Sequence, residues 1–477
     1  MADMAYAALV YSTVAKGRIA SIDTTAAEAS TGVALVMTHK NAPRLKPMPA
    51  FMTQPKAAGG DDLPVMQDDS VHWNGQPVAL VLADTQERAD HAASLVGVTY
   101  AIESGVTSFE AARAQGTEGG KFQGEPLKFE TGNAEDALSK APFRVDAVYE
   151  TPRHNHNAIE LHALTVAWKG EELTLHDASQ GVAHVAWSLA QIFGMDEKQV
   201  HVTSPFVGGG FGGKTLWSHH VLAAAASKLA GRPVRMTLSR EGVYRVVGGR
   251  TNTEQRVAIG AQADGRFDAI VHTGTVYMGH HNNMPEPFIL PTKSTYGAGA
   301  FKLDVEVAKM DMLANTFMRA PGEAVGSFAL ESAIDELADV QKITNFVLGK
   351  YARTITPDQR ARFSTAFRTY AEGVYQNRID DYHGESLKVT GSVVRKPGDV
   401  IVNTTISGGQ VGSPLPVSWR VMGGGNSWKV VDVQFKGVWL AITQQQDFVS
   451  TIDNAGGNID VLISQLQRDA QRPAARK

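Results

Sequence analysis

A run of glycines over residues 208–213 constrains this chain more than any other feature. The six residues hold five glycines around Phe211, and Lys214 follows directly. The surrounding pattern predicts a strand over 200–207 and a helix over 217–229. Glycine tolerates left-handed angles and lets the backbone approach other groups closely, so we expect a tight loop between the strand and the helix.

The residues themselves leave two interpretations of this loop open. Gly208 to Thr215 fits the pattern GxxxxGK[ST], in which backbone amides and a lysine cradle phosphate in a P-loop NTPase. The pattern also needs a Mg²⁺-binding aspartate after the loop, and the best candidate, Asp84, precedes it. Ser204 and Pro205 suit a central parallel strand poorly. The other interpretation is a glycine-rich turn that is purely structural.

The composition narrows the classes of function. A net charge of −4 gives no general attraction to nucleic acid or anionic lipid. The chain has no cysteine, which excludes disulfides, iron–sulfur clusters and thiol catalysis within it. Residues 1–20 show no secretory signal, and no apolar run approaches the length of a membrane span. These features do not decide between a cytoplasmic location and a periplasmic one reached with a partner.

The pattern of predicted helices and strands changes near Asp339. After this point, Thr356 and Pro357 mark a helix start, and alternating strands typical of an antiparallel sheet follow. We therefore expect an α+β chain of several domains. The expected parts are an α+β unit over 1–105, a linker over 106–145, a second unit over 146–339, a small α+β domain over 342–467 and a tail over 468–477.

Several phrases of the first two thirds stand in a recognisable order. They include Gly17-Arg18-Ile19, Gly75-Gln76-Pro77, Ser179-Gln180, the glycine run, and the stretch from Asn315 to Gly322. In this order they resemble the molybdenum-binding subunit of the xanthine dehydrogenase and aldehyde oxidoreductase family. Residues 1–105 resemble its hammerhead domain, and residues 146–339 resemble its first molybdopterin-binding domain. The phrase from Phe317 to Glu323 is most similar to the bacterial periplasmic aldehyde-oxidising branch.

The resemblance implies oxidation of aldehydes to carboxylic acids at a molybdenum–molybdopterin cofactor, in its cytosine dinucleotide form. It implies that the amide of Gln180 hydrogen-bonds a molybdenum oxo group, that the glycine loop brings its backbone near the metal, and that Arg319 lies beside the cofactor. The implied cofactor-binding residues are Gln180, Gly210, Phe211, Gly212, Gly213 and Arg319. The metal would be held through the pterin, and partner subunits would carry the iron–sulfur clusters and FAD.

Two departures from the family pattern bear on activity. Thr215 stands where purine-oxidising members carry a glutamate, which argues against purine substrates. The family's second molybdopterin-binding domain, which carries the general-base glutamate, has no counterpart here, and Glu323 belongs to a different motif. We therefore identify no catalytic residue and expect an incomplete enzyme.

The C-terminal part carries a different set of phrases. They include Phe346 to Tyr351, Thr356 to Arg360, Pro416 to Arg420 and Trp428 to Val433. These resemble the MlaC family, also called the toluene-tolerance auxiliary protein, which implies carriage of phospholipid in an apolar cavity between a sheet and helices. The residues expected to line such a pocket are Phe363, Phe367, Val374, Val438 and Leu440; for each of them an ordinary core position is an equal alternative. We expect a fusion protein in which parts of two families meet over 339–342.

Overall fold

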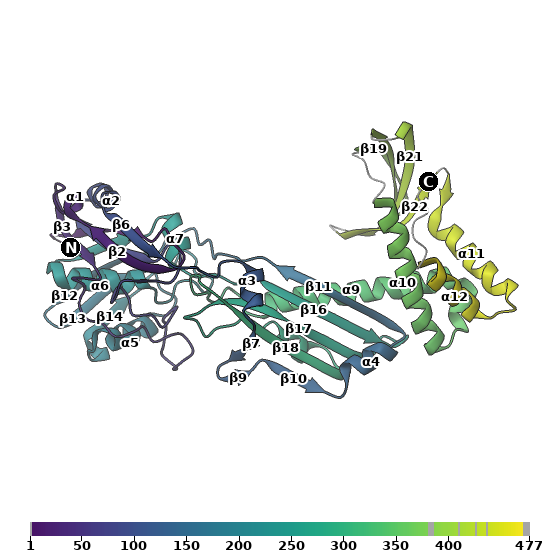
Figure 1. Ribbon diagram of the computed structural model, residues 1–477, viewed down its shortest axis with the longest axis horizontal. Helices are drawn as coiled ribbons and strands as arrows, with labels where there is room; N and C mark the ends of the chain where they lie inside the picture. The colour runs from purple at the N-terminus through teal and green to yellow at the C-terminus, as the bar shows by residue number, and fades with distance from the viewer. Residues whose placement is uncertain (1, 380–385, 409–410, 425–426, 436, 471–477) are drawn as a thin grey trace.

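The computed structural model describes residues 2–379, 386–408, 411–424, 427–435 and 437–470. The chain is elongated, with its N-terminal part at one end of the long axis and its C-terminal part at the other (Figure 1). It mixes helices and sheets throughout, which confirms the expected α+β class.

A seven-stranded sheet forms the N-terminal end, in the order β14-β13-β12-β15-β1-β5-β3. Its strands are β1 (Ala5–Tyr11), β3 (Val33–Thr38), β5 (Pro77–Ala83), β12 (Ala163–Lys169), β13 (Glu172–Asp177), β14 (Val200–Thr203) and β15 (Val234–Thr237). Strand β1 pairs with β15 in parallel and with β5 in antiparallel orientation. The expected units 1–105 and 146–339 therefore share one continuous sheet.

Helices cover this sheet because their apolar stripes match its faces. Helices α5 (Val182–Phe193) and α6 (Ser218–Ala230) bury their apolar residues against it in one large core. Helix α2 (Gln86–Ser94) packs on β1 and β5, and begins where the Thr85 hydroxyl accepts a hydrogen bond from the amide of Arg88. A small sheet of β2 (Gly17–Asp23), β4 (Ser70–Val71) and β6 (Gly97–Ile102) lies beside it, with the short helix α1 (Thr25–Glu28).

A second large sheet occupies the middle of the molecule, in the order β10-β18-β17-β16-β11, with β7 paired to β18. Its strands are β7 (Glu118–Gly119), β10 (Lys128–Thr131), β11 (Phe143–Thr151), β16 (Thr253–Ala261), β17 (Phe267–Gly279) and β18 (Ala298–Met310). The shorter elements nearby are α3 (Phe109–Ala114), β8 (Lys121–Phe122), β9 (Glu125–Pro126), α4 (Ala134–Lys140) and α8 (Ile289–Thr295). Two further short elements, η1 (Glu197–Gln199) and α7 (Arg240–Val246), belong to the N-terminal part.

The segment 106–145 is not the linker that the sequence suggested. It contributes β10 and β7 to the second sheet, and α4 packs on β16, β17 and β18. Leu138 of α4 is buried there, together with Ala258 and Val271. The sequence of this segment is polar because most of its residues are exposed.

The C-terminal part is a helical cluster with an antiparallel sheet in the order β19-β20-β21-β22-β23. Its elements are η2 (Gly349–Arg353), α10 (Pro357–Ile379), β19 (Ser386–Lys396), β20 (Asp399–Gly408), β21 (Val411–Gly424), β22 (Ser427–Phe435), β23 (Val438–Trp439), α11 (Leu440–Asn454) and α12 (Ile459–Ala470). The expected helix start is present, since the amide of Gln359 donates to the Thr356 hydroxyl at 3.2 Å.

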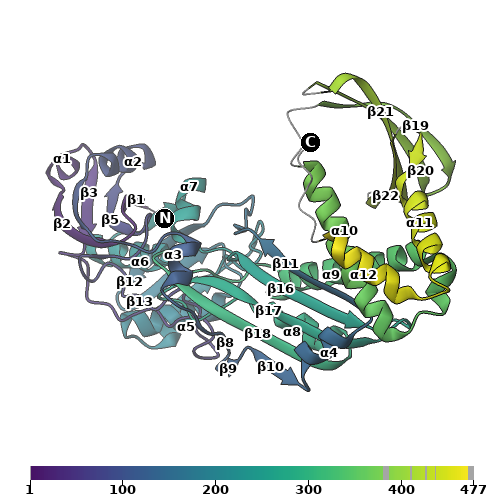
Figure 2. The ribbon, with the colours of Figure 1, turned by 45° about the vertical axis from the view of Figure 1, so that its right-hand side comes forward.

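One helix joins the two parts of the chain. Helix α9 (Glu323–Leu348) runs without a break across residues 339–342, where we expected a boundary. Its first half packs Ala329, Leu330 and Ala333 against the second sheet, and its last turn packs Val347 and Leu348 into the C-terminal helices. Figure 2 shows α9 passing beneath the second sheet toward α10 and α12.

Candidate functional site

The glycine loop connects β14 to α6 at the N-terminal end of the molecule. Gly209, Phe211 and Gly212 all have positive φ angles, of 95°, 54° and 104°. A Cβ on Gly212 would lie 2.5 Å from the carbonyl oxygen of Phe317, so only glycine fits this approach. A Cβ on Gly213 would lie 2.7 Å from a ring nitrogen of His156. The loop is therefore held in close contact with two other segments.

The side chain of Gln180 holds the loop through two hydrogen bonds. Its side-chain oxygen accepts hydrogen bonds from the amides of Gly212, at 3.0 Å, and Lys214, at 3.2 Å. Because backbone amides can only donate, the oxygen of this side chain must face the loop and its NH₂ group must point away. The side chain is exposed, and Gly210 leaves it room, since a Cβ there would lie 2.3 Å from the Gln180 oxygen. The NH₂ group is thus free to donate to a ligand.

Lys214 points away from any position over the loop. Its side chain is completely buried, and its nitrogen lies 2.5 Å from a carboxylate oxygen of Glu160. The same carboxylate accepts the amide of Gly208 at 2.7 Å, and these two hydrogen bonds lower the pKa of Glu160. A P-loop lysine must reach phosphate oxygens. The P-loop interpretation is therefore wrong for this loop.

Histidines and a tryptophan contact the C-terminal end of the loop, at Gly213. The carbonyl of Gly213 contacts Nε2 of His162 at 3.2 Å and accepts the indole N–H of Trp217 at 2.9 Å. Burial lowers the pKa of His162 to about 4, so the ring is neutral at pH 7 and Nε2 carries the donated proton. His156 contacts the carbonyl of Phe317 in the same way.

Arg319 lies beside the glycine loop. Its amide donates to the carbonyl of Phe211 at 2.9 Å, which ties the two segments together. Its side chain is exposed and, in the part of the chain that the structure describes, forms no ion pair. A free guanidinium group beside a glycine loop is a fixed positive charge.

The site residues expected from the sequence separate into two groups. Gln180, Gly210, Phe211, Gly212, Gly213 and Arg319 lie together at the glycine loop. The lipid-pocket residues lie in the C-terminal part. The residues that sequence reasoning did not select for the site are Glu160, His156, His162 and Trp217. Opposite charges 54 positions apart, as in Lys214 and Glu160, give no signal in one sequence, so this pair could not be found from spacing.

The donors around the loop fit an anionic group. Among the described residues, the amides of Gly209, Gly210 and Phe211 donate no hydrogen bond to the protein. Consecutive amides in alternating conformations form a concave anion site. The NH₂ group of Gln180 adds a donor and the guanidinium of Arg319 adds a positive charge, while the nearby carboxylate of Glu160 is paired with Lys214. The residues present therefore fit an anionic cofactor such as a molybdenum pterin.

Metal ligation by side chains and membrane insertion find no support in the described residues. No cluster of three or more His, Asp or Glu side chains there could hold a metal ion. No helix within the described ranges is long and apolar enough to cross a bilayer.

The expected lipid-pocket residues do not share one surface. Phe363 is fully buried, and its ring packs with Phe367 and Phe448 in the core of α10, α11 and α12. These two positions are core residues, so the ordinary alternative is correct for them. Val438 is exposed in β23 and Leu440 is half-buried at the start of α11. Val374 belongs to α10, but its side chain lies outside the described residues.

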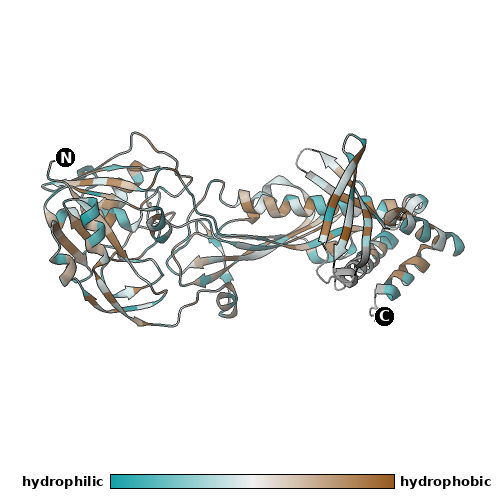
Figure 3. Cartoon of the chain, turned by 90° about the horizontal axis from the view of Figure 1, so that it is seen from above, coloured by the Kyte–Doolittle hydropathy of each residue, from teal (hydrophilic) through white to brown (hydrophobic). Residues whose placement is uncertain are grey.

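The C-terminal sheet has one apolar face. Partners in register share a face of a sheet, and the rows across β19, β20 and β21 join Leu387 with Ile406 and Leu415, and Val394 with Val400 and Val421. Hydrophobic and hydrophilic residues alternate along these strands (Figure 3). At the edges this face is open: Val389 and Val394 are 60% and 67% exposed.

Three family models match the chain. The aldehyde oxidase and xanthine dehydrogenase a/b hammerhead domain matches residues 1–104. The molybdopterin cofactor-binding domain matches residues 117–349, and the MlaC protein family matches residues 326–468. The last two matches overlap within α9.

Individual relatives agree. The chain is 35% identical over 337 residues to the aldehyde oxidoreductase molybdenum-binding subunit PaoC of Escherichia coli O157:H7, covering 70% of this chain and 44% of that protein. It is 31% identical over 356 residues to the abscisic-aldehyde oxidase of Arabidopsis thaliana, covering 70% of this chain and 26% of that protein. This chain thus spans less than half the length of these relatives.

Solved structures support the fold. The aldehyde oxidoreductase of Desulfovibrio desulfuricans superposes with a TM-score of 0.63 at 20% identity, covering 84% of this chain and 46% of that one. The quinoline 2-oxidoreductase of Pseudomonas putida 86 gives 0.62 at 20% identity, covering 85% and 55%. The N-terminal part of the chain is thus similar to the molybdenum-binding subunits of the xanthine dehydrogenase and aldehyde oxidoreductase family, and its C-terminal part matches the family model of MlaC proteins.

Proposed function

We propose that the glycine loop binds a molybdenum–molybdopterin cofactor in its cytosine dinucleotide form, as part of an aldehyde-oxidising enzyme. The observation that carries this proposal is the arrangement of Gln180, whose oxygen is used by the loop and whose NH₂ group is left to donate. When bound, such a cofactor supplies a two-electron acceptor for oxidation of an aldehyde to a carboxylic acid.

Each residue of the loop has a role that follows from its chemistry. Gln180 donates to an oxygen of the cofactor through its NH₂ group. The free amides of Gly209, Gly210 and Phe211 bind its negative charge, and Arg319 supplies a fixed cation. None of these groups can accept a proton at neutral pH, so they bind and orient without acting as a base.

We propose that another polypeptide segment supplies the general base. The surface around the loop supports this, because it is apolar and open: Ile159 and Phe206 are 95% and 85% exposed, and Phe211 is 41% exposed. Exposed apolar clusters of this kind mark surfaces that another protein segment covers. We further propose partner subunits that carry iron–sulfur clusters and FAD, since this chain has no cysteine to ligate such clusters.

The first test is the metal and pterin content of the full chain, purified from a host that makes molybdenum cofactor. Mass spectrometry should find molybdenum and pterin in comparable amounts, and the variant Gln180→Leu should contain much less of both. Metal-free protein from such a host, even after coexpression with iron–sulfur and FAD subunits of the family, would end the proposal.

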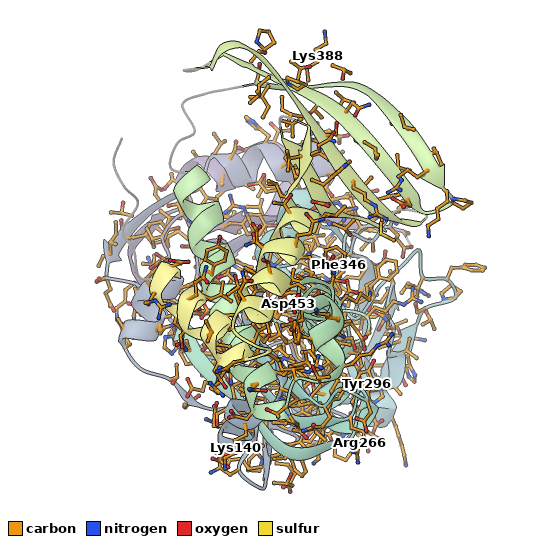
Figure 4. The ribbon with its side chains drawn as sticks, turned by 90° about the vertical axis from the view of Figure 1, so that its right-hand side faces the viewer. Lys140, Arg266, Tyr296, Phe346, Lys388 and Asp453 are labelled. Atoms are coloured by element: carbon orange, nitrogen blue, oxygen red, sulfur yellow. The ribbon has the colours of Figure 1, made fainter. Side chains whose placement is uncertain are left out.

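We propose a second function for the C-terminal part, the binding of phospholipid acyl chains. The open apolar face of its sheet supports this, because contact with acyl chains would remove exposed apolar side chains from water, which is favourable. These side chains are Leu387, Val389, Val394 and Val430. Figure 4 shows Lys388 at the outer end of this sheet, away from the helices that carry Phe346 and Asp453.

Organic extraction of the same purified sample tests the second function. Phospholipid should co-purify with the unchanged chain and be reduced in Val389→Lys, which places a charge on the apolar face. The matched control is Lys388→Gln, since the neighbouring residue of a strand faces the opposite side. Equal lipid content in both variants would contradict the proposal.

A further inference from the structure

A buried arginine contacts the segment that carries Arg319. Arg250 follows α7 and is 5% exposed. Its Nη2 atom lies 2.7, 2.6 and 3.0 Å from the carbonyl oxygens of Met318, Arg319 and Ala320. One guanidinium nitrogen thus donates toward three successive carbonyls, which brings them to one side of a tight turn.

A buried glutamate completes the contact. Oε1 of Glu286 accepts Nε of Arg250 at 3.1 Å and the amide of Gly322 at 2.7 Å. Glu286 is 4% exposed, and its pKa is raised, first of all by burial. A buried charge of either sign is costly alone. The two residues therefore satisfy each other while both hold the turn at 318–322.

The turn needs to be held. Ala320 has a φ of 60° and Gly322 a φ of 82°, both in the left-handed region. For alanine this conformation is unfavourable and persists only where the surroundings enforce it. A Cβ on Gly322 would lie 2.6 Å from the carbonyl of Pro287, which shows how closely the turn is packed.

The same turn sets the position of Arg319 relative to the glycine loop. The amide of Arg319 donates to the carbonyl of Phe211, while its own carbonyl accepts from Arg250. We call Arg250 and Glu286, with their contacts to the turn, the clamp. Hydrogen bonds also fix the backbone at Arg250: the amide of Thr316 donates to the carbonyl of Gly249, and the amide of His154 donates to the carbonyl of Arg250.

We propose that Arg250, oriented by Glu286, is a positioning residue that holds the Arg319 turn in place for the cofactor. The inference rests on the proposed function of the loop. Lysine cannot replace Arg250, because the clamp uses a planar group with donors in two directions, one toward Glu286 and one toward the carbonyls, whereas an ammonium is a single point. The pair acts through Arg319 and need not touch the cofactor.

Hydrogen exchange of the full chain tests the clamp without any cofactor. In Arg250→Lys, the hydrogen-bonded amides of Arg319 and Gly322 should exchange at least about tenfold faster than in the unchanged chain, with other segments unaffected. The control is Arg256→Lys, six positions further along, where the arginine pairs with Glu135 and Asp146 far from the turn. Unchanged exchange at Arg319 and Gly322 in Arg250→Lys would overturn the proposal.

Molybdenum content separates positioning from general stability. When purified from a cofactor-producing host, Arg250→Lys should contain less than half of the molybdenum of the unchanged chain, whereas Arg256→Lys should contain the normal amount. The comparison is made where the unfolding midpoints show both variants to be equally stable. Normal molybdenum in Arg250→Lys despite fast local exchange would also overturn the positioning role. If the unchanged chain itself contains no molybdenum, the proposed function fails, and the exchange data still decide whether the clamp exists.

Discussion

The ammonium nitrogen of Lys214 lies 2.5 Å from a carboxylate oxygen of Glu160, with the lysine side chain fully buried and that of the glutamate 39% exposed. The two ends of this ion pair are therefore in different surroundings. Removal of the glutamate leaves a buried charge without a partner, whereas removal of the lysine leaves a carboxylate that water can reach. The pair should respond differently to changes at its two ends.

We expect Glu160→Ala to destabilise the N-terminal part by about 3 kcal/mol, as for other buried charges that lose their partner. Lys214→Met keeps the length of the side chain and should cost about 1 kcal/mol, since Glu160 still accepts the amide of Gly208. Urea unfolding followed by tryptophan fluorescence measures both. A larger cost for Lys214→Met would contradict the asymmetry.

Nucleotide binding provides a separate prediction about the same lysine. Because Lys214 is held by Glu160 and cannot reach over the loop, the unchanged chain should bind no Mg²⁺–ATP in calorimetry at millimolar concentrations. Lys214→Ala should leave that result as it is. Measurable ATP binding that Lys214→Ala abolishes would restore the P-loop interpretation.

Local elements of this fold could be predicted from the sequence because local rules decide them. Thr356 caps the helix that it was expected to cap. The α+β class and the C-terminal meander are confirmed for the same reason. The shared sheet could not be predicted, since the parallel pairing of Ala5 with Val234 joins strands more than two hundred residues apart.

The continuous helix α9 across residues 339–342 was compatible with the sequence, although the change of composition there favoured a boundary. No glycine or proline stands between Gly326 and Gly349, so nothing in the sequence stops a helix there. The change of composition near Asp339 suggested a boundary, and tertiary packing instead continues α9 into the C-terminal helices. At the site, the glycine loop was visible as a pattern and Gln180 only through the family resemblance, whereas Glu160, His162 and Trp217 act through contacts that only the fold creates.

Gly210→Ala should disturb the loop without any change of charge. Its Cβ would lie 2.3 Å from the side-chain oxygen of Gln180, so either the loop or the glutamine must move. We expect a loss of about 1–3 kcal/mol, as for other overpacked positions, and reduced molybdenum content. The matched control is Gly297→Ala, where nothing lies within 4 Å of the new Cβ. Equal effects of the two variants would show that Gln180 does not rest on the loop.

Acid should destabilise this protein through its buried histidines, and His272 allows a clean test. His272 is fully buried in the second sheet, with Thr292 and Gln255 as its hydrogen-bond partners and the ring of Phe288 beside it. None of these neighbours titrates, and burial lowers the pKa of His272 to about 3. The folded chain therefore keeps this ring neutral while the unfolded chain protonates it below about pH 6.5.

The sign of the effect follows from proton uptake. The contribution of His272 is complete above pH 6.5 and is lost as the pH falls toward 3, at up to about 1.4 kcal/mol per pH unit. His272→Gln should be less stable than the unchanged chain at pH 7. Between pH 6 and pH 4 its unfolding free energy should depend less steeply on pH, because about one proton fewer is taken up on unfolding. The control is His91→Gln, at an exposed position of α2. Unfolding midpoints in urea across this pH range measure the slopes, and parallel curves for all three proteins would mean that His272 is not held neutral by burial.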